Sequence, residues 1–213
     1  MFLPASLTAQ KNACALPDTP TMTDKTIHIL IPTTFERRKR LSNCIDSIHK
    51  NAGYAHIIST YENFREGFVK PCHRLLRDLK TETMVWCIGD DTILTQSDTL
   101  KRLMGVFEKF PSDVVVQPDD GIHHGRIITM PFCAAGTMLE NGIHFEFFLN
   151  FCDNVFTEIM VKKRKYIYCP EIRVEHQHWI NRKAPPDDTY AYAASKFDED
   201  RTAYYKVKAK LGL

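Results

Sequence analysis

The segment that most constrains the fold is the apolar run Met-Val-Trp-Cys-Ile at 84–88, which leads directly into Gly89-Asp90-Asp91. A short apolar run bounded by a turn signal is typical of a fully buried strand. The two acids then lie at its carboxyl end, where open α/β sheets bind their ligands. Adjacent carboxylates repel each other unless a cation lies between them, and hard oxygen ligands suit Mg²⁺ or Mn²⁺. The segment therefore indicates a metal and diphosphate site, with a simple strand-closing turn as the alternative.

Strand-like and helix-like segments alternate around this run. The first part of the chain offers predicted strands at 26–31, 56–61, 84–88 and 113–117, and predicted helices at 37–51, 69–79 and 99–110. Such alternation predicts an α/β fold with a mostly parallel, mixed sheet covered by helices on both faces. The later part is less regular, with predicted strands at 126–132, 165–168 and 172–176 and helical regions at 145–163 and from 187 onward.

Length and composition indicate one globular domain. The 213 residues suffice for a sizeable core, and the net charge of +2 does not mark an obligate nucleic-acid binder. Seven cysteines without a C-x-x-C pair predict reduced, buried thiols in a cytoplasmic protein, and no apolar run is long enough for a transmembrane segment. We expect a loosely ordered N-terminal extension over 1–24, a main domain over 25–180 and a C-terminal helical segment over 181–213 packed on it.

Four short motifs follow one another in a fixed order. They are Ile-Pro-Thr-Thr-Phe-Glu-Arg at 31–37, Gly-Asp-Asp at 89–91, Phe-Cys-Asp-Asn at 151–154 and Pro-Glu-Ile-Arg-Val-Glu-His-Gln-His-Trp at 170–179. Their order and spacing resemble those of family 2 glycosyltransferases of the GT-A fold, over roughly residues 26–180. The resemblance implies a Rossmann-like GT-A sheet and an inverting, metal-dependent glycosyltransferase, hexosyltransferase-like. Its donor would be a nucleotide-diphosphate sugar, with a UDP-sugar favoured, and its ion Mn²⁺ or Mg²⁺.

The resemblance assigns a metal-binding role to two residues. Asp91 matches the last acid of the family's D-x-D motif, which binds the ion, and Asp90 matches the middle residue, which faces ribose or sugar. His176 matches the late histidine that reaches the metal or diphosphate, and is favoured over His178. Gly89 stands where the family has the first acid of the motif.

The resemblance also assigns the catalytic base to Asp153. This residue matches the second acid of the family's E-D pair, whose first member is replaced by Cys152. A general base must lie within direct or one-water reach of the hydroxyl that it deprotonates. The alternative is a structural role, because aspartate is also a good N-cap for the helix that follows.

Nucleotide contacts are expected from the ends of the first two strands. By resemblance, the residues that lie beside the base, ribose and phosphates are Pro32, Thr33, Thr34, Glu36 and Arg37. Tyr61 is a candidate for stacking on the base, and Glu62 is a candidate for reading it.

Three further features allow other interpretations. The basic runs 37–40 and 162–165 are solvated helix faces, or together a surface for a polyanion. The 118–124 segment, with His123 and His124, is a turn or part of an acceptor mouth. Alternative functions are a nucleotidyltransferase of similar fold, or a catalytically degenerate relative that binds nucleic acid or a protein. The acceptor is left open, with a glycan or a modified DNA base among the candidates, and so is the oligomeric state.

Overall fold

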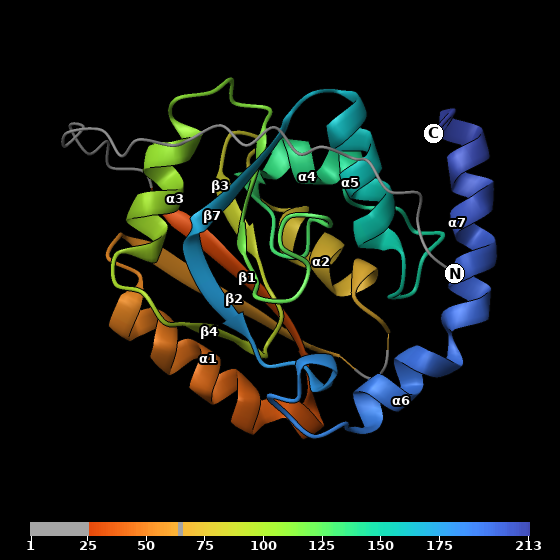
Figure 1. Cartoon of the computed structure of the whole chain (residues 1–213), viewed down its shortest axis with the longest axis horizontal. Helices are drawn as coiled ribbons and strands as arrows, with labels where there is room; N and C mark the ends of the chain where they lie inside the picture. The colour runs from red at the N-terminus through yellow and green to blue at the C-terminus, as the bar shows by residue number, and fades with distance from the viewer. Residues whose placement is uncertain (1–25, 64–65) are drawn as a thin grey trace.

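A single mixed sheet of seven strands organises the chain (Figure 1). The computed structural model describes residues 26–63 and 66–213, except for the side chains at 62 and 63. The strands are β1 (Ile27–Thr34), β2 (His56–Asn63), β3 (Met84–Cys87), β4 (Thr92–Leu94), β5 (Val115–Asp119), β6 (Phe132–Ala134) and β7 (Tyr166–His176), arranged in the order β2-β1-β3-β6-β5-β7-β4. β1 pairs in parallel with β2 and β3, and β5 pairs in parallel with β7. β6 lies antiparallel between β3 and β5, and β4 is antiparallel to β7.

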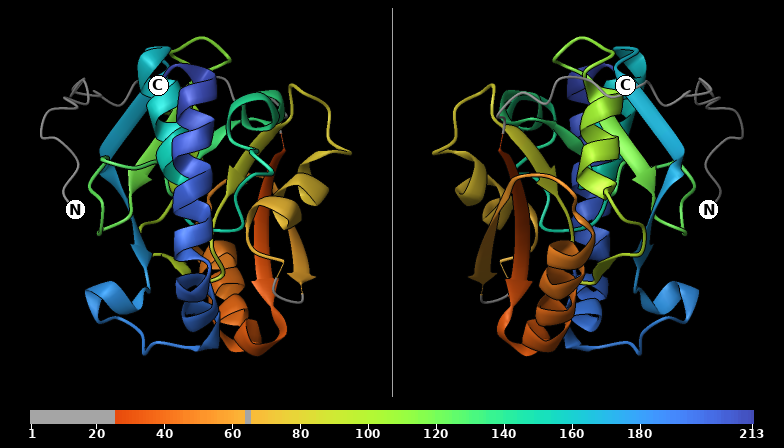
Figure 2. Two further views of the ribbon diagram at one scale, coloured as in Figure 1. Left: turned by 90° about the vertical axis from the view of Figure 1, so that its right-hand side faces the viewer. Right: turned by 90° about the vertical axis from the view of Figure 1, so that its left-hand side faces the viewer.

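Helices cover both faces of this sheet, as predicted. The α-helices are α1 (Arg38–Asn51), α2 (Val69–Leu76), α3 (Thr99–Phe107), α4 (Ala135–Asn141), α5 (Cys152–Lys162), α6 (Asp188–Ser195) and α7 (Phe197–Leu211). Helices α1 and α3 share one hydrophobic core with the sheet, and α2, α4, α5 and α7 share the other. The two side views show α7 on the outside of this second layer (Figure 2). The α/β prediction with a mixed sheet is therefore confirmed.

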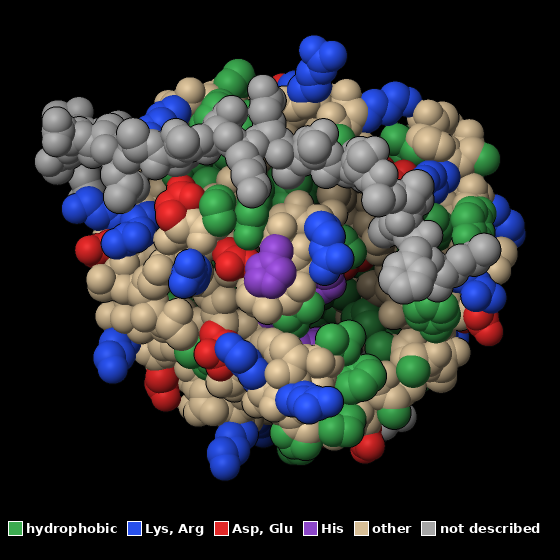
Figure 3. Space-filling model, viewed as in Figure 1, with side chains coloured by type: hydrophobic (Ala, Val, Ile, Leu, Met, Phe, Trp, Pro, Cys, Tyr) green, Lys and Arg blue, Asp and Glu red, His purple; other side chains and the backbone are tan. Residues whose placement is uncertain are grey.

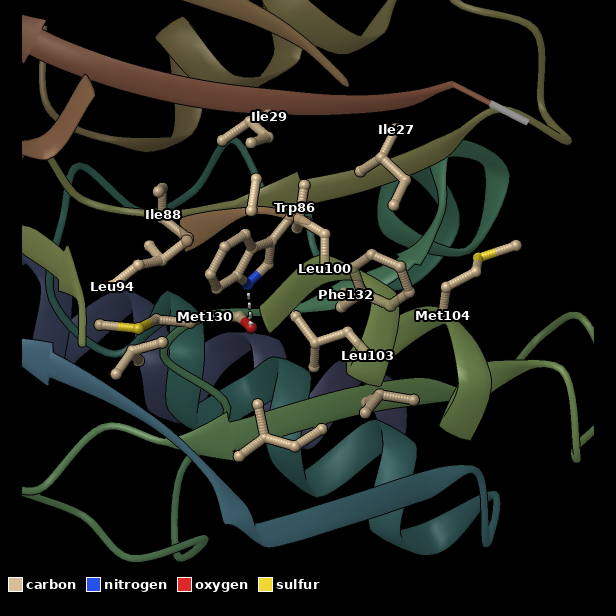
Figure 4. Close-up of a cluster of buried hydrophobic side chains, with 14 of the residues drawn as sticks. Ile27, Ile29, Trp86, Ile88, Leu94, Leu100, Leu103, Met104, Met130 and Phe132 are labelled. Atoms are coloured by element: carbon tan, nitrogen blue, oxygen red, sulfur yellow. Dashed lines mark hydrogen bonds between the residues drawn. The ribbon is translucent and has the colours of Figure 1, made fainter. Parts of the chain in front are cut away.

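Alternation along the strands builds the two cores. Ile29 and Trp86 face the α1/α3 side, whereas their neighbours Leu30 and Val85 face the α2/α5 side, because successive side chains of a strand point to opposite faces. Trp86 is fully buried, and its indole Nε1 donates a hydrogen bond to the Met130 carbonyl at 3.2 Å (Figure 4). A buried indole N–H without such a partner would cost about 1–3 kcal/mol.

The described cysteines are buried and form no disulfide among the described residues, as expected for reduced thiols. Cys72 on α2 and Cys87 on β3 lie with their Sγ atoms 3.2 Å apart in the second core. Burial is the main cause that raises the pKa of the Cys72 thiol well above its usual value, followed by its neighbour Cys87. These thiols pack as small apolar groups.

Two predicted elements in the second half are wrong in extent. The strand expected over 126–132 begins only at Phe132, because side chains take the amides that a strand would pair: Gln117 accepts from Met130 N at 2.9 Å, and Thr157 accepts from Ile128 N at 2.8 Å. The helix expected from 145 begins at Cys152, because the Asp200 carboxylate binds the amides of residues 148–150.

Two other predicted boundaries also moved. The separate strands expected at 165–168 and 172–176 form one strand, β7, in which a register shift opposite Pro118 and Asp119 accommodates the irregular middle. β1 continues through Pro32 to Thr34 instead of stopping at the proline. Residues 1–24, the predicted extension, lie outside the described residues. No described helix is long and apolar enough to cross a membrane.

Candidate active site

A cleft of about 560 Å³ opens beside the carboxyl ends of β3 and β7. Asp91 and His176 line it from one side, and Asp153 from α5 lines it as well. Seen from the front, histidine side chains gather around the hollow and hydrophobic side chains lie along its lower right side (Figure 3). The structure therefore brings the predicted metal-binding residues and the predicted base to one cavity.

The buried side chain of Asp91 makes several polar contacts at the cleft. Its Oδ1 lies 3.3 Å from His176 Nε2, and its Oδ2 accepts a hydrogen bond from the Tyr190 hydroxyl at 2.8 Å. Arg37 lies 3.7 Å from Oδ2. Burial by itself raises the pKa of Asp91, but His176, Arg37 and Tyr190 together hold it well below its usual range. Asp91 is therefore ionised at neutral pH and available to bind a cation.

Asp90, unlike Asp91, lies outside the lining of the cleft and is held by protein groups. It accepts hydrogen bonds from Thr33 Oγ1 at 2.7 Å and from the Arg37 guanidinium at 2.8 Å. Burial, opposed by Arg37, raises the pKa of Asp90 to about 6. Asp90 does not line the cleft, so in this structure it anchors Arg37 and the end of β1.

The two histidines at and just after the end of β7, His176 and His178, make different contacts. His176, at the end of β7, contacts Asp91, whereas His178 packs edge-on against the Tyr190 ring at a centroid distance of 4.5 Å. Burial and the neighbouring His176 lower the pKa of His178 to about 4. Both rings line the cleft, 5.2 Å apart, but only His176 has a carboxylate partner among the described residues.

Helix α6 closes the site from the C-terminal segment, a contribution that the sequence reasoning missed. Asp187, the N-cap of α6, accepts from Arg37 Nε at 3.1 Å and pairs with Arg40 at 3.1 Å. The guanidiniums of both arginines lie over the Tyr190 ring, with centroid distances of 4.5 and 5.5 Å. The available signal was local: Pro-Pro-Asp-Asp at 185–188 marks a helix start, but it does not reveal the partners of Asp187.

Gly89, which departs from the family pattern, has a geometric explanation. A Cβ atom at this position would lie 2.5 Å from Asp91 Oδ1. Any side chain at 89 would therefore require a shift of the Asp91 carboxylate, whose Oδ1 is the atom that contacts His176. The missing acid and the Asp91–His176 contact are thus parts of one arrangement.

The residues around Asp91 fit a partial metal site. No group of three or more metal-binding side chains occurs among the described residues, so the protein offers Asp91 and His176 only. Magnesium-type ions are commonly bound by one or two carboxylates, with the remaining positions taken by substrate phosphates and water. An ionised carboxylate beside an imidazole in an open cleft fits such an ion, provided that a bound diphosphate supplies further oxygens.

Asp153 lies in the first turn of α5, two positions after its N-cap. The N-cap position is occupied by Phe151, whose φ of 65° places it in the left-handed region. Asp153 Oδ1 accepts a hydrogen bond from Asn154 N at 2.8 Å. Burial is the main cause that raises the pKa of Asp153, which makes this carboxylate a better proton acceptor than an exposed one. Cys152 faces the core, with its thiol donating to the Leu149 carbonyl, so an acid there would be buried.

The predicted nucleotide contacts divide into two groups. Thr34 and Glu36 line a small cavity of about 40 Å³ beside α6, and Pro32 and Thr33 are buried at the end of β1. Tyr61 on β2 is paired instead with Arg74, whose guanidinium lies 5.0 Å from the centre of its ring. The side chain of Glu62 lies outside the described residues.

The two basic runs are engaged in separate local contacts. Arg37 and Arg40 face the site through Asp187, and Lys162 donates to the Gly212 carbonyl at the far end of α7. Lys163 binds Asn141, and Lys165 pairs with Asp113. These contacts support helix-end roles for the second run, whereas Arg37 and Arg40 of the first run belong to the candidate site.

Solved structures place this architecture among known folds. One is the mannosyltransferase PcManGT from Pyrobaculum calidifontis in complex with GDP-Man and Mn²⁺, with a TM-score of 0.55, 12% identity, and coverage of 78% of this chain and 59% of that one. Another is a Drosophila β1,4-galactosyltransferase 7 mutant in complex with manganese, UDP-Gal and xylobiose, with a TM-score of 0.54, 11% identity, and coverage of 79% of each chain. The chain has the GT-A glycosyltransferase fold. No protein-family model and no curated protein matches it.

Within the GT-A fold, the cleft has the expected place. It lies at the carboxyl ends of the strands, where open α/β sheets bind their ligands. The chain spans about three fifths of the length of the mannosyltransferase structure.

Proposed function

We propose that this protein is an inverting, metal-dependent glycosyltransferase, which moves a sugar from a nucleotide-diphosphate sugar to an acceptor hydroxyl. The observation that carries the proposal is the presence of Asp91, His176 and Asp153 in one cleft. The solved structures of this fold that carry Mn²⁺ with GDP-Man or UDP-Gal support a divalent ion and a nucleotide-sugar donor.

In the proposed reaction Asp153 is the general base. Its carboxylate takes the proton of the acceptor hydroxyl while that oxygen attacks the anomeric carbon, and the bond to the diphosphate breaks with its electron pair. Because attack and departure occur on opposite faces, the anomeric configuration inverts. A positioned base contributes about 10²–10⁴-fold to the rate.

The donor diphosphate is proposed to bind on the opposite wall. Asp91 and His176 would hold the ion, which when bound stabilises the negative charge that develops on the leaving diphosphate. Arg37 lies beside Asp91 and adds a fixed positive charge at the same place. Thr34 and Glu36 are proposed to contact the nucleoside, with Pro32 and Thr33 shaping the loop that carries them.

Donor binding tests the proposal first. Purified protein with Mn²⁺ is screened against UDP-, GDP- and other nucleotide sugars by thermal shift and by slow donor hydrolysis. Asp91→Asn is expected to lose Mn²⁺-dependent donor stabilisation, whereas Asp153→Asn keeps donor binding and loses transfer by about 10²-fold or more. Asp46→Asn, an exposed position on α1, is the matched control and should behave like the parent protein.

Two results would contradict the proposal. No stabilisation by any nucleotide sugar, combined with tight polynucleotide binding, would favour the degenerate nucleic-acid-binding alternative. Full turnover by Asp153→Asn would remove this residue from the role of base.

A further inference from the structure

A further carboxylate of the cleft region, Asp120, is buried and saturated with hydrogen bonds. Its Oδ1 accepts from the backbone amides of Ile122 at 2.9 Å and His123 at 2.7 Å. Its Oδ2 accepts from His123 Nδ1 and from Thr129 Oγ1, each at 2.9 Å. Only 1% of Asp120 is exposed. Such a carboxylate holds the following loop, and the His123 ring with it, in one orientation.

The bond to Asp120 decides which nitrogen of His123 carries the proton. Because an ionised carboxylate can only accept, Nδ1 carries a proton, and in the neutral form of the ring Nε2 keeps its lone pair. His123 lines the cleft, with 28% of its side chain exposed. No described residue donates a hydrogen bond to Nε2. The ring therefore offers the cleft a fixed hydrogen-bond acceptor.

This acceptor shares the cleft with the proposed base, because His123 and Asp153 both line it. A molecule that fills the cleft against Asp153 therefore has the His123 ring in the same cavity.

The same part of the cleft has apolar walls. Phe151, Ile122 and Ile127 line it, and Phe68 contributes a further ring. A ligand that suits these walls and a fixed acceptor has apolar faces and hydroxyl groups around its edge. A sugar ring has both properties, since its C–H faces pack on apolar side chains while its hydroxyls donate hydrogen bonds.

We propose that His123 is an acceptor-binding residue, whose Nε2 accepts a hydrogen bond from a second hydroxyl of a sugar, next to the hydroxyl that attacks. This inference rests on the proposed transferase function and names its acceptor class. The attacking hydroxyl gives its proton to Asp153, and the second hydroxyl keeps its own proton. Asp120 acts as a positioning residue through His123.

Two substitutions separate the nitrogens of the ring. His123→Asn keeps an N–H donor near the position of Nδ1, so the bond to Asp120 is preserved while Nε2 is lost. The side-chain amide of His123→Gln reaches the position of Nε2. This variant is therefore expected to restore part of the acceptor binding that His123→Asn loses. His124→Asn is the matched control, because His124 pairs with Asp119 in the same loop but is 64% exposed and does not line the cleft. Its φ of 48° suits asparagine.

The assay measures transfer to methyl glycosides of glucose, galactose, xylose and mannose, each compared with its deoxy analogues. For His123→Asn the acceptor KM is expected to rise about tenfold or more, with kcat and the donor KM changing much less. Removing one neighbouring hydroxyl from the sugar should cost the parent enzyme a similar factor. The same removal should cost His123→Asn little, since the bond is already gone.

The possible failures are distinguishable from failure of the proposed function. Absence of donor binding and hydrolysis contradicts the transferase itself. If donor hydrolysis proceeds, transfer to none of the glycosides overturns the sugar-acceptor inference, and so does transfer only to an oligonucleotide with a hydroxymethylated base. An unchanged acceptor KM in His123→Asn, or equal losses in His123→Asn and His124→Asn, also overturns it.

Discussion

Asp200 on α7 ties the C-terminal helix to the wall of the cleft. Its side chain is 1% exposed and accepts from Phe148 N at 2.7 Å, Leu149 N at 3.1 Å and Asn150 N at 2.7 Å, with the Asn150 side chain as a fourth donor at 3.0 Å. Leu149 and Asn150 both line the cleft. We therefore predict that Asp200→Asn destabilises the protein and loosens this loop.

The magnitude follows from the two oxygens of the carboxylate. Asp200 Oδ2 accepts three of the four bonds, so the best orientation of an asparagine keeps its oxygen there and turns its NH₂ toward Phe148 N. One buried amide then lacks an acceptor, and the remaining bonds lose the assistance of the negative charge. Together these losses amount to about 2–3 kcal/mol. For a domain of this size they lower Tm by about 4–12 °C.

Urea unfolding, followed by far-UV circular dichroism, measures the free energy, and hydrogen exchange shows whether the amides of 148–150 lose protection. Asp198→Asn is the control, because the Asp198 side chain is 83% exposed and, among the described residues, pairs only with Arg201 in the same helix. It is expected to change stability by less than about 0.5 kcal/mol. A loss below about 1 kcal/mol in Asp200→Asn, with unchanged exchange at 148–150, would refute the reasoning.

Three other predictions concern backbone strain and pH. Gly125→Ala should destabilise the protein by about 1–3 kcal/mol in thermal unfolding, because φ is +74° and the new Cβ would lie 2.4 Å from the Tyr168 ring. Gly105→Ala, in α3 with open space around it, should instead stabilise by about 0.5–1 kcal/mol, and destabilisation there would contradict the free space. Burial raises the pKa of Asp120, but hydrogen bonds from His123 and nearby amides hold it well below its usual value. Its contribution to stability is therefore full above a pH of about 4 and is lost on further acidification, so urea titrations should show a shallower acid dependence in Asp120→Asn.

Sequence reasoning located the parts of the fold that depend on local pattern. The apolar alternation of β1 and β3 and the spacing of α1 and α3 are properties of consecutive residues, and these elements lie close to where they were expected. By contrast, β4 is three residues long, and among the described strands it pairs only with β7, about eighty residues further along the chain. Nothing within such a short segment distinguishes it from a loop.

In the candidate site, too, some residues could be predicted from local motifs and others could not. Asp91, His176 and Asp153 follow from motifs, but their partners come from places that no motif connects. The Tyr190 hydroxyl, for example, binds Asp91 across 99 positions of sequence. Asp187 was visible as a helix start but not as the partner of Arg37. Long-range polar contacts depend on the assembled fold, so a single sequence does not contain them in readable form.

Alkylation of the buried cysteines can report which part of the folded protein opens first. Six cysteines are buried across both layers of the fold, and an alkylating reagent reacts only with an exposed thiolate. Labelling under native conditions therefore waits for the chain to open. If the two layers open together, mass spectra will show protein with these six sites either untouched or fully tagged. If α2 or α5 separates first, a partly tagged population will appear, carrying label on Cys72 or Cys152 while Cys44 and Cys169 in the other core stay unmodified.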